Sequence, residues 1–499
     1  MSTLAITASA ACALLLFAAL TYPKSVLYAA IFFLPWRGLD PYFFLGLSLP
    51  RILIAVVGLA TIAHLAKSRN ALKAPISAAL LIFIFYSVAI SLARAPFLPH
   101  MDVAGGEMRA PTNRALLQIV YFLVILVIPL FVYPVHFKVE RDCTKVVKVF
   151  LISLISLAVL GWIQLGIWYV TGFNPFPIGL IPSFFGKFQT ADAGFAMAGI
   201  DLHRMCSLGG EPKDLGQAFA IGLFVVQAIL ACGVPTKQER RLRWCWLFLF
   251  FSLVVTYSTS ATFLWGIGTG LEVIVLLLKP GISSGFGRAL RNAYMVALIG
   301  AAVLIVSLSY FAVSTRSVRQ IATGRTIDRM GLEDFDQAAL GFLEQNPDWM
   351  IFGTGMGNVH LHANSFLSAD AATYASGTVF RPKTGLLRMA SEIGVVGIVL
   401  WLVGFFSQLR NLLNASRLGR RGRTNSDLAN FTGPLVIVVV AVAGGNLAVS
   451  MDEFLYAALA LSVAVTSSMQ SLTFGSASML YSLKRQGNLR PVPAAPDVS

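Results

Sequence analysis

Most of the side chains that could do chemistry in this chain lie in one polar stretch, between residues 323 and 397. Arginines stand at its start, a glycine-rich run lies at 353–357, and two histidines, His360 and His362, follow. Arginine side chains match the geometry of phosphate oxygens, and neutral histidine can take up a proton. Closely spaced glycines let backbone N–H groups approach a ligand. The stretch therefore predicts an anion site beside a proton acceptor.

The arginines offer a rigid fork of N–H donors that suits a diphosphate at a membrane surface. The alternative is that they reach lipid headgroups, or pair with Asp328 and Glu333. Their position outside the membrane runs against the usual preference of basic residues for the cytoplasmic side, which favours a functional role. The candidates for diphosphate binding are Arg204, Arg325, Arg329 and Arg319.

The two histidines allow three interpretations. On a strand, His360 and His362 would share a face, which is compatible with a metal site. No acidic or cysteine partner stands at ligand spacing, so we predict no metal and no cofactor. A general base that deprotonates a sugar hydroxyl is the functional alternative. The remaining alternative is a structural, hydrogen-bonded histidine.

The composition is that of a membrane protein. Of the 499 residues, 57% are hydrophobic and 12% are charged, the mean hydropathy is +0.74, and soluble domains average about 25% charged residues. Apolar runs of about 20 residues predict an all-α polytopic protein with transmembrane helices. The expected number is 13 if the short run 25–36 crosses the membrane and 12 if it does not. The expected spans are 4–22, 25–36, 51–66, 75–94, 114–134, 148–171, 214–233, 245–258, 261–278, 293–313, 386–409, 432–449 and 454–474.

Basic loops set the expected orientation. Lys and Arg concentrate in alternate short loops, which places those loops in the cytoplasm and explains the net charge of +15 without nucleic acid. Transmembrane helices then occupy 1–313, with outer loops at 95–113 and 172–213. One large periplasmic loop covers 314–385, the C-terminal spans cover 386–474, and 475–499 form a disordered cytoplasmic tail.

Two further features of the outer segments bear on a site. Apolar residues recur at helical spacing over 332–343 with acids on the other face, which predicts an amphipathic helix on the membrane or over a cavity. The segment 172–213 brings His203, Arg204 and Glu211 to the same side. Within the spans, Glu272 is charged at mid-helix, and Asp452 and Glu453 stand at an outer helix end; such charges often mark ion pathways.

The motifs together resemble a known family. They run from Gly324-Arg325 through the glycine triplet, His362 and Asn364-Ser365-Phe366-Leu367 to Glu392-Ile393-Gly394-Val395-Val396-Gly397, with Arg204 and Gly210-Glu211-Pro212 upstream. This pattern is similar to the O-antigen ligase and O-antigen polymerase superfamily, most clearly over 245–405. Members are bacterial inner-membrane glycosyltransferases with about a dozen spans and one large periplasmic loop.

The resemblance implies a metal-independent transfer from a glycan on undecaprenyl diphosphate. It implies that Arg325, and more loosely Arg204, bind the diphosphate, and that His362 or His360 activates the acceptor hydroxyl. Glu211, Asn364 and Arg381 are candidates for contacts with the glycan. The chain departs from the family in three places: Ala363 separates His362 from Asn364, the spacing from Asn364 to Gly394 is longer, and the turn 258–261 lacks an arginine.

We expect a polymerase for O-antigen or exopolysaccharide, because Glu211-Pro212 and the altered histidine motif look less like a ligase. The alternative is an O-antigen ligase that moves the glycan onto lipid A–core in lipopolysaccharide biosynthesis. A rival of another class is a lipid-linked glycan flippase or other transporter. The expected partners are the lipid-linked oligosaccharide, a glycan or lipid A–core acceptor, the bilayer and a candidate chain-length regulator. The expected location is the inner membrane, with the active site facing the periplasm.

Overall fold

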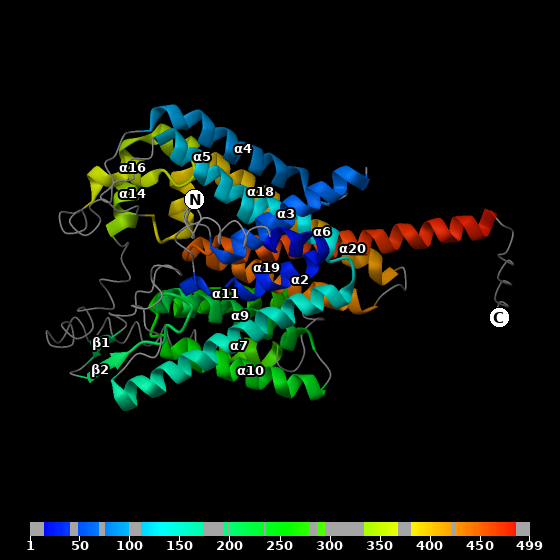
Figure 1. Ribbon diagram of the computed structural model, residues 1–499, viewed down its shortest axis with the longest axis horizontal. Helices are drawn as coiled ribbons and strands as arrows, with labels where there is room; N and C mark the ends of the chain where they lie inside the picture. Colours follow the sequence, from blue (N-terminus) through cyan, green and yellow to red (C-terminus); the bar gives the residue numbers. More distant parts are fainter. Residues whose placement is uncertain are drawn as a thin grey trace.

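The computed structural model shows a bundle of long apolar helices (Figure 1). The structure describes residues 14–39, 48–68, 75–98, 111–172, 194–197, 200–233, 236–278, 287–294, 334–367, 381–421 and 426–485. The helices of the bundle are α2 (Pro23–Phe33), α3 (Leu49–Ser68), α4 (Ala78–Arg94), α5 (Pro111–Phe122), α6 (Ile128–His136), α7 (Glu140–Thr171), α9 (Pro212–Cys232), α10 (Thr236–Val255), α11 (Thr259–Leu278), α18 (Gly385–Arg421), α19 (Ser426–Ala448) and α20 (Asp452–Arg485).

The protein is a multi-pass membrane protein, as its hydropathy predicts. Within the described residues, eight helices are long and apolar enough to cross a membrane. A ninth span results if the helix Leu14–Thr21 and α2, which meet at 117°, are counted together. The segments predicted at 4–22 and 25–36 therefore meet at a sharp bend, since Pro23 starts a new helix in another direction. The predicted span 293–313 lies almost wholly outside the described residues.

Helix α9 forms the centre of one half of the bundle, because its surface is buried nearly throughout. Glycines on it let neighbouring helices approach closely. A Cβ at Gly216 would meet the Cβ of Ala261 at 2.7 Å, and one at Gly222 would collide with Leu154. The loop before α9 is fixed as well: the side-chain oxygen of Gln164 accepts the N–H of Ser207 at 2.8 Å.

One end of the bundle carries the small elements that lie outside the spans; we call it the capped end (Figure 1). The hairpin of β1 (Gly194–Met197) and β2 (Ile200–His203) is antiparallel, with Gly194 opposite His203. This hairpin was not predicted, since 172–213 was expected to be a loop. The other elements at this end are α14 (Asp334–Gln345), α15 (Pro347–Phe352), α16 (Val359–Ala363) and the short helices η1 (Arg37–Leu39), η2 (Ala95–Phe97) and η6 (Asn364–Phe366).

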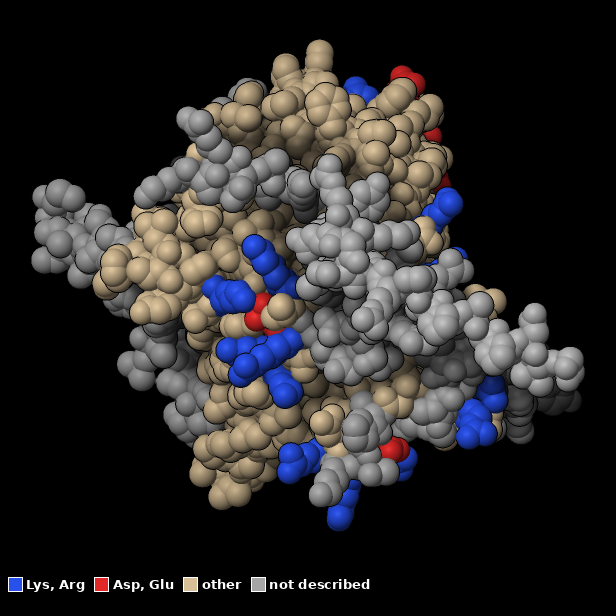
Figure 2. All heavy atoms as spheres, turned by 90° about the vertical axis from the view of Figure 1, so that its right-hand side faces the viewer, with Lys and Arg blue, Asp and Glu red and all other residues tan. Residues whose placement is uncertain are grey.

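The opposite end, which we call the basic end, gathers Lys and Arg around an acidic side chain (Figure 2). Lys24 pairs with Asp142 at 2.8 Å, and the ammonium of Lys145 lies 4.5 Å from the ring centre of Tyr28. The helix α20 continues past this end to Arg485. The expectation of a disordered tail from 475 is therefore wrong for 475–485, while 486–499 lie outside the described residues.

The path of the chain is interrupted at two points that matter for the capped end. A single π-helical turn, η3 (Leu123–Val127), joins α5 to α6. In α18, Gly394 takes a left-handed φ of 70°, so the helix breaks there. The first part of α18 thus becomes a separate segment, and some of its side chains line a cavity.

Candidate functional site

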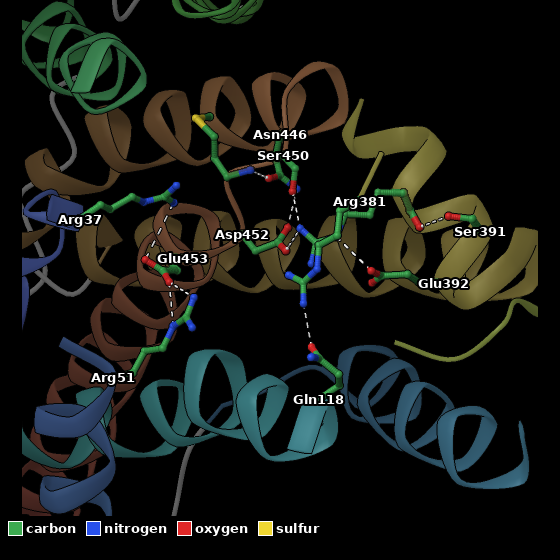
Figure 3. A network of polar contacts seen from close by, with 12 residues as sticks. Arg37, Arg51, Gln118, Arg381, Ser391, Glu392, Asn446, Ser450, Asp452 and Glu453 are labelled. Atoms are coloured by element: carbon green, nitrogen blue, oxygen red, sulfur yellow. Dashed lines mark hydrogen bonds and ion pairs between the residues drawn. The ribbon is translucent and has the colours of Figure 1, made fainter. Parts of the chain in front are cut away.

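A cavity of about 140 Å³ with several charged side chains in its wall lies between the helices at the capped end. Three arginines and two carboxylates line it, together with Gln118, Tyr456 and several apolar side chains. Figure 3 shows Arg51, Arg381 and Gln118 among them. The helices α18 and α20 begin at its wall, with Gly385 and Asp452. Backbone N–H groups at helix starts carry partial positive charge, which favours anions. The charged lining residues are Arg51, Arg381, Arg388, Glu392 and Asp452.

Arg388 links two helices across the cavity. Its Nη1 lies 2.8 Å from an Asp452 carboxylate oxygen on α20, and its Nε lies 3.2 Å from Glu392, one turn further along α18. Two carboxylates therefore compensate the charge of one guanidinium. The contact is partly buried, since the side chains of Arg388 and Asp452 are 19% and 24% exposed. Removing one partner leaves a partly buried charge unmatched.

A second set of ion pairs extends this network to α9. The Nε of Arg51 donates to Glu453 at 2.8 Å, and Arg37 lies 3.9 Å from the same carboxylate (Figure 3). Arg37 also lies 3.1 Å from Asp214. The pairs Arg37–Asp214 and Arg51–Glu453 join residues 177 and 402 positions apart. They fix the starts of α3, α9 and α20 against one another at the capped end.

Arg381 differs from the other arginines of the cavity. The described residues offer it one hydrogen bond, to Oε1 of Gln118 at 2.8 Å, and no carboxylate within 4.0 Å. Burial and the neighbouring Arg388 lower the pKa of Arg381 to about 10, so it stays charged at neutral pH. The sequence placed this residue near the glycan, and the structure places it in the cavity wall.

The glycine-rich run 353–357 forms part of the same wall, with Met356 and Gly357 lining the cavity. Its backbone N–H groups bind the protein itself: Thr354 donates to the carbonyl of Ser391 and Gly355 to that of Glu392, both at 2.9 Å. The expectation that these N–H groups are available to a ligand is therefore wrong for those two residues. The run instead holds the broken part of α18 in place.

The two histidines lie on the short helix α16, not on a strand, so they do not share a face. His360 is buried at 1% exposure. His362 stacks against Phe342, with ring centres 5.5 Å apart, and its Nε2 is buried with no hydrogen-bond partner among the described residues. Burial, and secondarily Arg94, lower the pKa of His362. Among the described residues that line the cavity, neither histidine is present.

The amphipathic helix predicted at 332–343 is present as α14, and its apolar face packs against other parts of the protein. Its apolar residues pack against α16 rather than lipid, in a cluster that includes Ala339, Phe342 and Val359. Asp336, expected on the polar face, is buried at 3% exposure. Its carboxylate accepts the N–H groups of Lys383 and Thr384 at 2.8 and 3.2 Å, so α14 is tied to the start of α18.

The upstream candidates lie on the other side of the capped end. Arg204 donates to the carbonyl of Thr256 at 3.1 Å, and Glu211, just before α9, pairs with Lys213 at 2.7 Å. His203 stacks on Trp168, with ring centres 4.1 Å apart. None of these residues lines the cavity around Arg381.

The predicted site residues do not all lie in the cavity. Arg381 lies in the cavity, Asn364 is exposed at η6, and the predicted Arg319, Arg325 and Arg329 lie outside the described residues. Sequence reasoning missed Arg51, Arg388 and Glu392. The signal available was Arg388 and Glu392 standing one helical turn apart in an otherwise apolar span, a pattern that marks a paired, functional charge.

Comparison with known proteins adds no assignment to this geometry. No family model matches the chain. No curated protein matches it either. The function is therefore argued from the residues and their arrangement.

Proposed function

We propose that this protein is a membrane glycosyltransferase that polymerises undecaprenyl-diphosphate-linked glycan units, for O-antigen or exopolysaccharide. One observation carries the proposal: the arginine-lined cavity at the capped end is walled by the glycine-rich run and by the Glu392-Ile393 segment. These are two of the motifs on which the resemblance to the ligase and polymerase superfamily rests. An arginine-lined site suits the diphosphate of such a donor.

The charge distribution supports an orientation. Lys and Arg gather at the basic end (Figure 2), which favours the cytoplasm for that end and the periplasm for the capped end. In a bacterial inner membrane, the cavity would then meet lipid-linked glycans presented from the outer leaflet. This orientation follows from the charge rule, and it is part of the proposal.

The proposed reaction transfers a sugar to a hydroxyl. The acceptor oxygen forms a bond to the anomeric carbon, and the bond from that carbon to the diphosphate oxygen breaks. The diphosphate leaves with the electron pair, and arginines stabilise its charge. The candidates are the arginines of the cavity and, from the resemblance, Arg204 and Arg325, with Arg319 and Arg329 as further candidates. His362 or His360 takes the proton of the acceptor hydroxyl. Because Nε2 of His362 is buried, its role requires the acceptor to reach between α14 and α16.

A lipid-linked glycan transporter is the rival from another class. It predicts polar side chains along a path through the middle of the bundle. The cavity among α2, α6, α9 and α19 is lined by apolar side chains apart from the Tyr133 hydroxyl. Among the described residues, Glu272 is a buried carboxylate in a span, and its oxygens have no hydrogen-bond partner there. The apolar lining of this cavity favours the transferase, and Glu272 alone does not make a polar path among the described residues.

The test uses the full-length protein in nanodiscs with lipid-linked repeat units. A ladder of longer lipid-linked glycans from repeat units alone supports the polymerase. Product that appears only after lipid A–core is added identifies the ligase instead. No product under either condition, from protein that remains folded, would overturn the transferase proposal.

A further inference from the structure

The short helix α15 presents an apolar surface at the capped end. Its last three residues, Met350, Ile351 and Phe352, are 46%, 44% and 44% exposed. Asp348, in the first turn, is exposed as well, so the helix is polar at its start and apolar at its end. Exposed apolar side chains are unfavourable in water and favourable against lipid acyl chains. The position of α15 relative to the spans decides which of the two surrounds it.

Contacts with α4 give the depth of α15, because α4 belongs to the candidate span Ala78–Phe97. The guanidinium of Arg94, near the capped end of α4, lies 4.0 Å from the ring centre of Trp349. The hydroxyl of Tyr86 lies 3.1 Å from the carbonyl oxygen of Phe352. Tyr86 precedes Arg94 by eight residues, or about 12 Å of helix. The helix α15 therefore descends alongside α4 toward the middle of the span.

The chain that follows α15 returns along the same helix. The N–H of Met356 donates to the hydroxyl of Ser91 at 3.0 Å. Leu361, on α16, packs in one cluster with Ala95, just past the end of α4. The contact points on α4 thus run from position 94 down to 86, and then back through 91 to 95. A descent of about 12 Å is less than half of a hydrocarbon core of about 30 Å, so the chain enters and leaves on the same side.

The turn after α15 is built as non-helical chain at membrane depth requires. Lipid offers no hydrogen-bond partners, so irregular backbone is tolerated there only where protein groups satisfy it. Thr354 donates to the carbonyl of Ser391 and Gly355 to that of Glu392, both at 2.9 Å. With the bond from Met356 to α4, these bonds hold the turn between the helices of two candidate spans.

The exposed side chains of α15 adjoin apolar surfaces of the spans. A Cβ at Gly394 would lie 2.3 Å from the carbonyl oxygen of Ile351, and the next residue of α18, Val395, is exposed. On α4, Phe85 stands beside Tyr86 and is exposed too. In a membrane-spanning helix, exposed apolar side chains of this kind face lipid. The apolar end of α15 therefore continues the lipid-facing surface of α4 and α18.

We propose that 347–356 is a re-entrant segment, which enters the bilayer from the capped end, turns near the level of Tyr86 and leaves on the same side. Met350, Ile351 and Phe352 lie against lipid acyl chains. For this segment, the inference replaces the expectation that all of 314–385 lies in the periplasm. It places Met356, and with it one wall of the cavity, below the membrane surface. It depends on the multi-pass architecture and not on the proposed function.

The experiment measures the depth of α15 with a fluorescent label. Full-length Ile351→Cys is labelled with bimane and placed in nanodiscs of lipid brominated near the middle of its acyl chains, since bromine quenches bimane only on close approach. Val399→Cys, at an exposed position of α18, is the reference within lipid. Glu344→Cys, at an exposed position of α14, is the matched control outside. The wild type, labelled in the same way, gives the background from its five cysteines.

We expect brominated lipid to quench the label at position 351 at least twofold more strongly than at position 344, and about as strongly as at position 399. Iodide, which stays in water, should quench in the reverse order. Quenching by iodide that is equal at 351 and 344, with none by brominated lipid at 351, would overturn the re-entrant segment. Met350→Cys repeats the test at the neighbouring position, and the unfolding temperature shows that each variant is folded.

Discussion

The N–H of Gly355 donates to the carbonyl oxygen of Glu392 at 2.9 Å, which joins the glycine-rich run to α18 where that helix breaks. The contact requires glycine on the run. Gly353 has a φ of +82°, and a Cβ there would overlap the same carbonyl. Two motifs separated by some forty residues in the chain therefore act as one structural unit in the cavity wall.

Replacing Gly353 should disrupt this unit. We expect Gly353→Ala to lower the free energy of unfolding by about 2–4 kcal/mol, because it combines a strained φ with a backbone collision. Thermal unfolding in detergent checks this. Gly166→Ala is the control, since a Cβ at that position of α7 meets nothing within 4 Å. Equal stability of the two variants would contradict the close packing of the run against α18.

Asp336 should hold the outer helix α14 to the bundle. Asp336→Ala leaves the N–H groups of Lys383 and Thr384 without their acceptor, at a cost of about 2–3 kcal/mol. Hydrogen exchange of α14 should rise more than exchange within the spans. Glu344→Ala, at an exposed position of the same helix, is the control. Unchanged exchange in Asp336→Ala would mean that the apolar cluster alone fixes α14.

The pair of Arg388 with Asp452 should behave as a linked unit. Asp452→Asn removes one charge and leaves Arg388 with Glu392, so we expect a loss of about 1–3 kcal/mol, between the values for exposed and fully buried pairs. The double variant with Arg388→Gln should recover part of this loss. Thermal unfolding of all four proteins gives the coupling. Additive losses would show that the two side chains do not stabilise one another.

The stability contributed by His362 should depend on pH. Its pKa in the folded protein lies below the ordinary value of about 6.5, because burial and Arg94 disfavour the charged ring. Folding therefore favours the neutral form, and the contribution is present above pH 6.5 and is lost as pH falls through the folded pKa. The unfolding temperature of the wild type relative to His362→Gln should fall between pH 7.5 and 5.5.

The control for this effect is His64→Gln, which changes an exposed histidine of α3. The difference between the wild type and this variant should vary less over the same pH range. If His362→Gln and the wild type kept a constant difference from pH 7.5 to 5.5, the buried ring would not be held neutral by folding. A base with a lowered pKa also predicts that turnover persists to pH values below 6.5.

The sequence allowed the polytopic, all-helical class to be predicted, because a span depends on a local run of apolar residues. The described residues hold eight or nine candidate spans, against the 12 or 13 expected for the whole chain. The start of α9 at Pro212 follows from a proline in the first turn. The bend between Thr21 and Pro23 and the break at Gly394 were not predicted. Each depends on contacts with distant segments, which no local pattern records.

The site was harder to predict for the same reason. Arg51 and Glu453 are 402 residues apart, and their pairing follows from how α3 and α20 meet. Helical periodicity assigned Asp336 to the polar face. The hydrogen bonds that bury it come from the N–H groups of Lys383 and Thr384, which are distant in the sequence, so the periodicity of the helix carries no information about them. The spacing of His360 and His362 would place both rings on one face of a strand. The segment is the short helix α16, in which residues two positions apart point in different directions.

The measurement that tests the central claim most directly is the release of free undecaprenyl diphosphate. Full-length protein in nanodiscs is given the lipid-linked repeat unit, with and without lipid A–core, and the free lipid diphosphate is quantified. Each glycosyl transfer must release one such molecule, so the account predicts release that tracks the growth of the glycan. Movement of intact lipid-linked glycan across the bilayer without any release would contradict the account and identify a transporter.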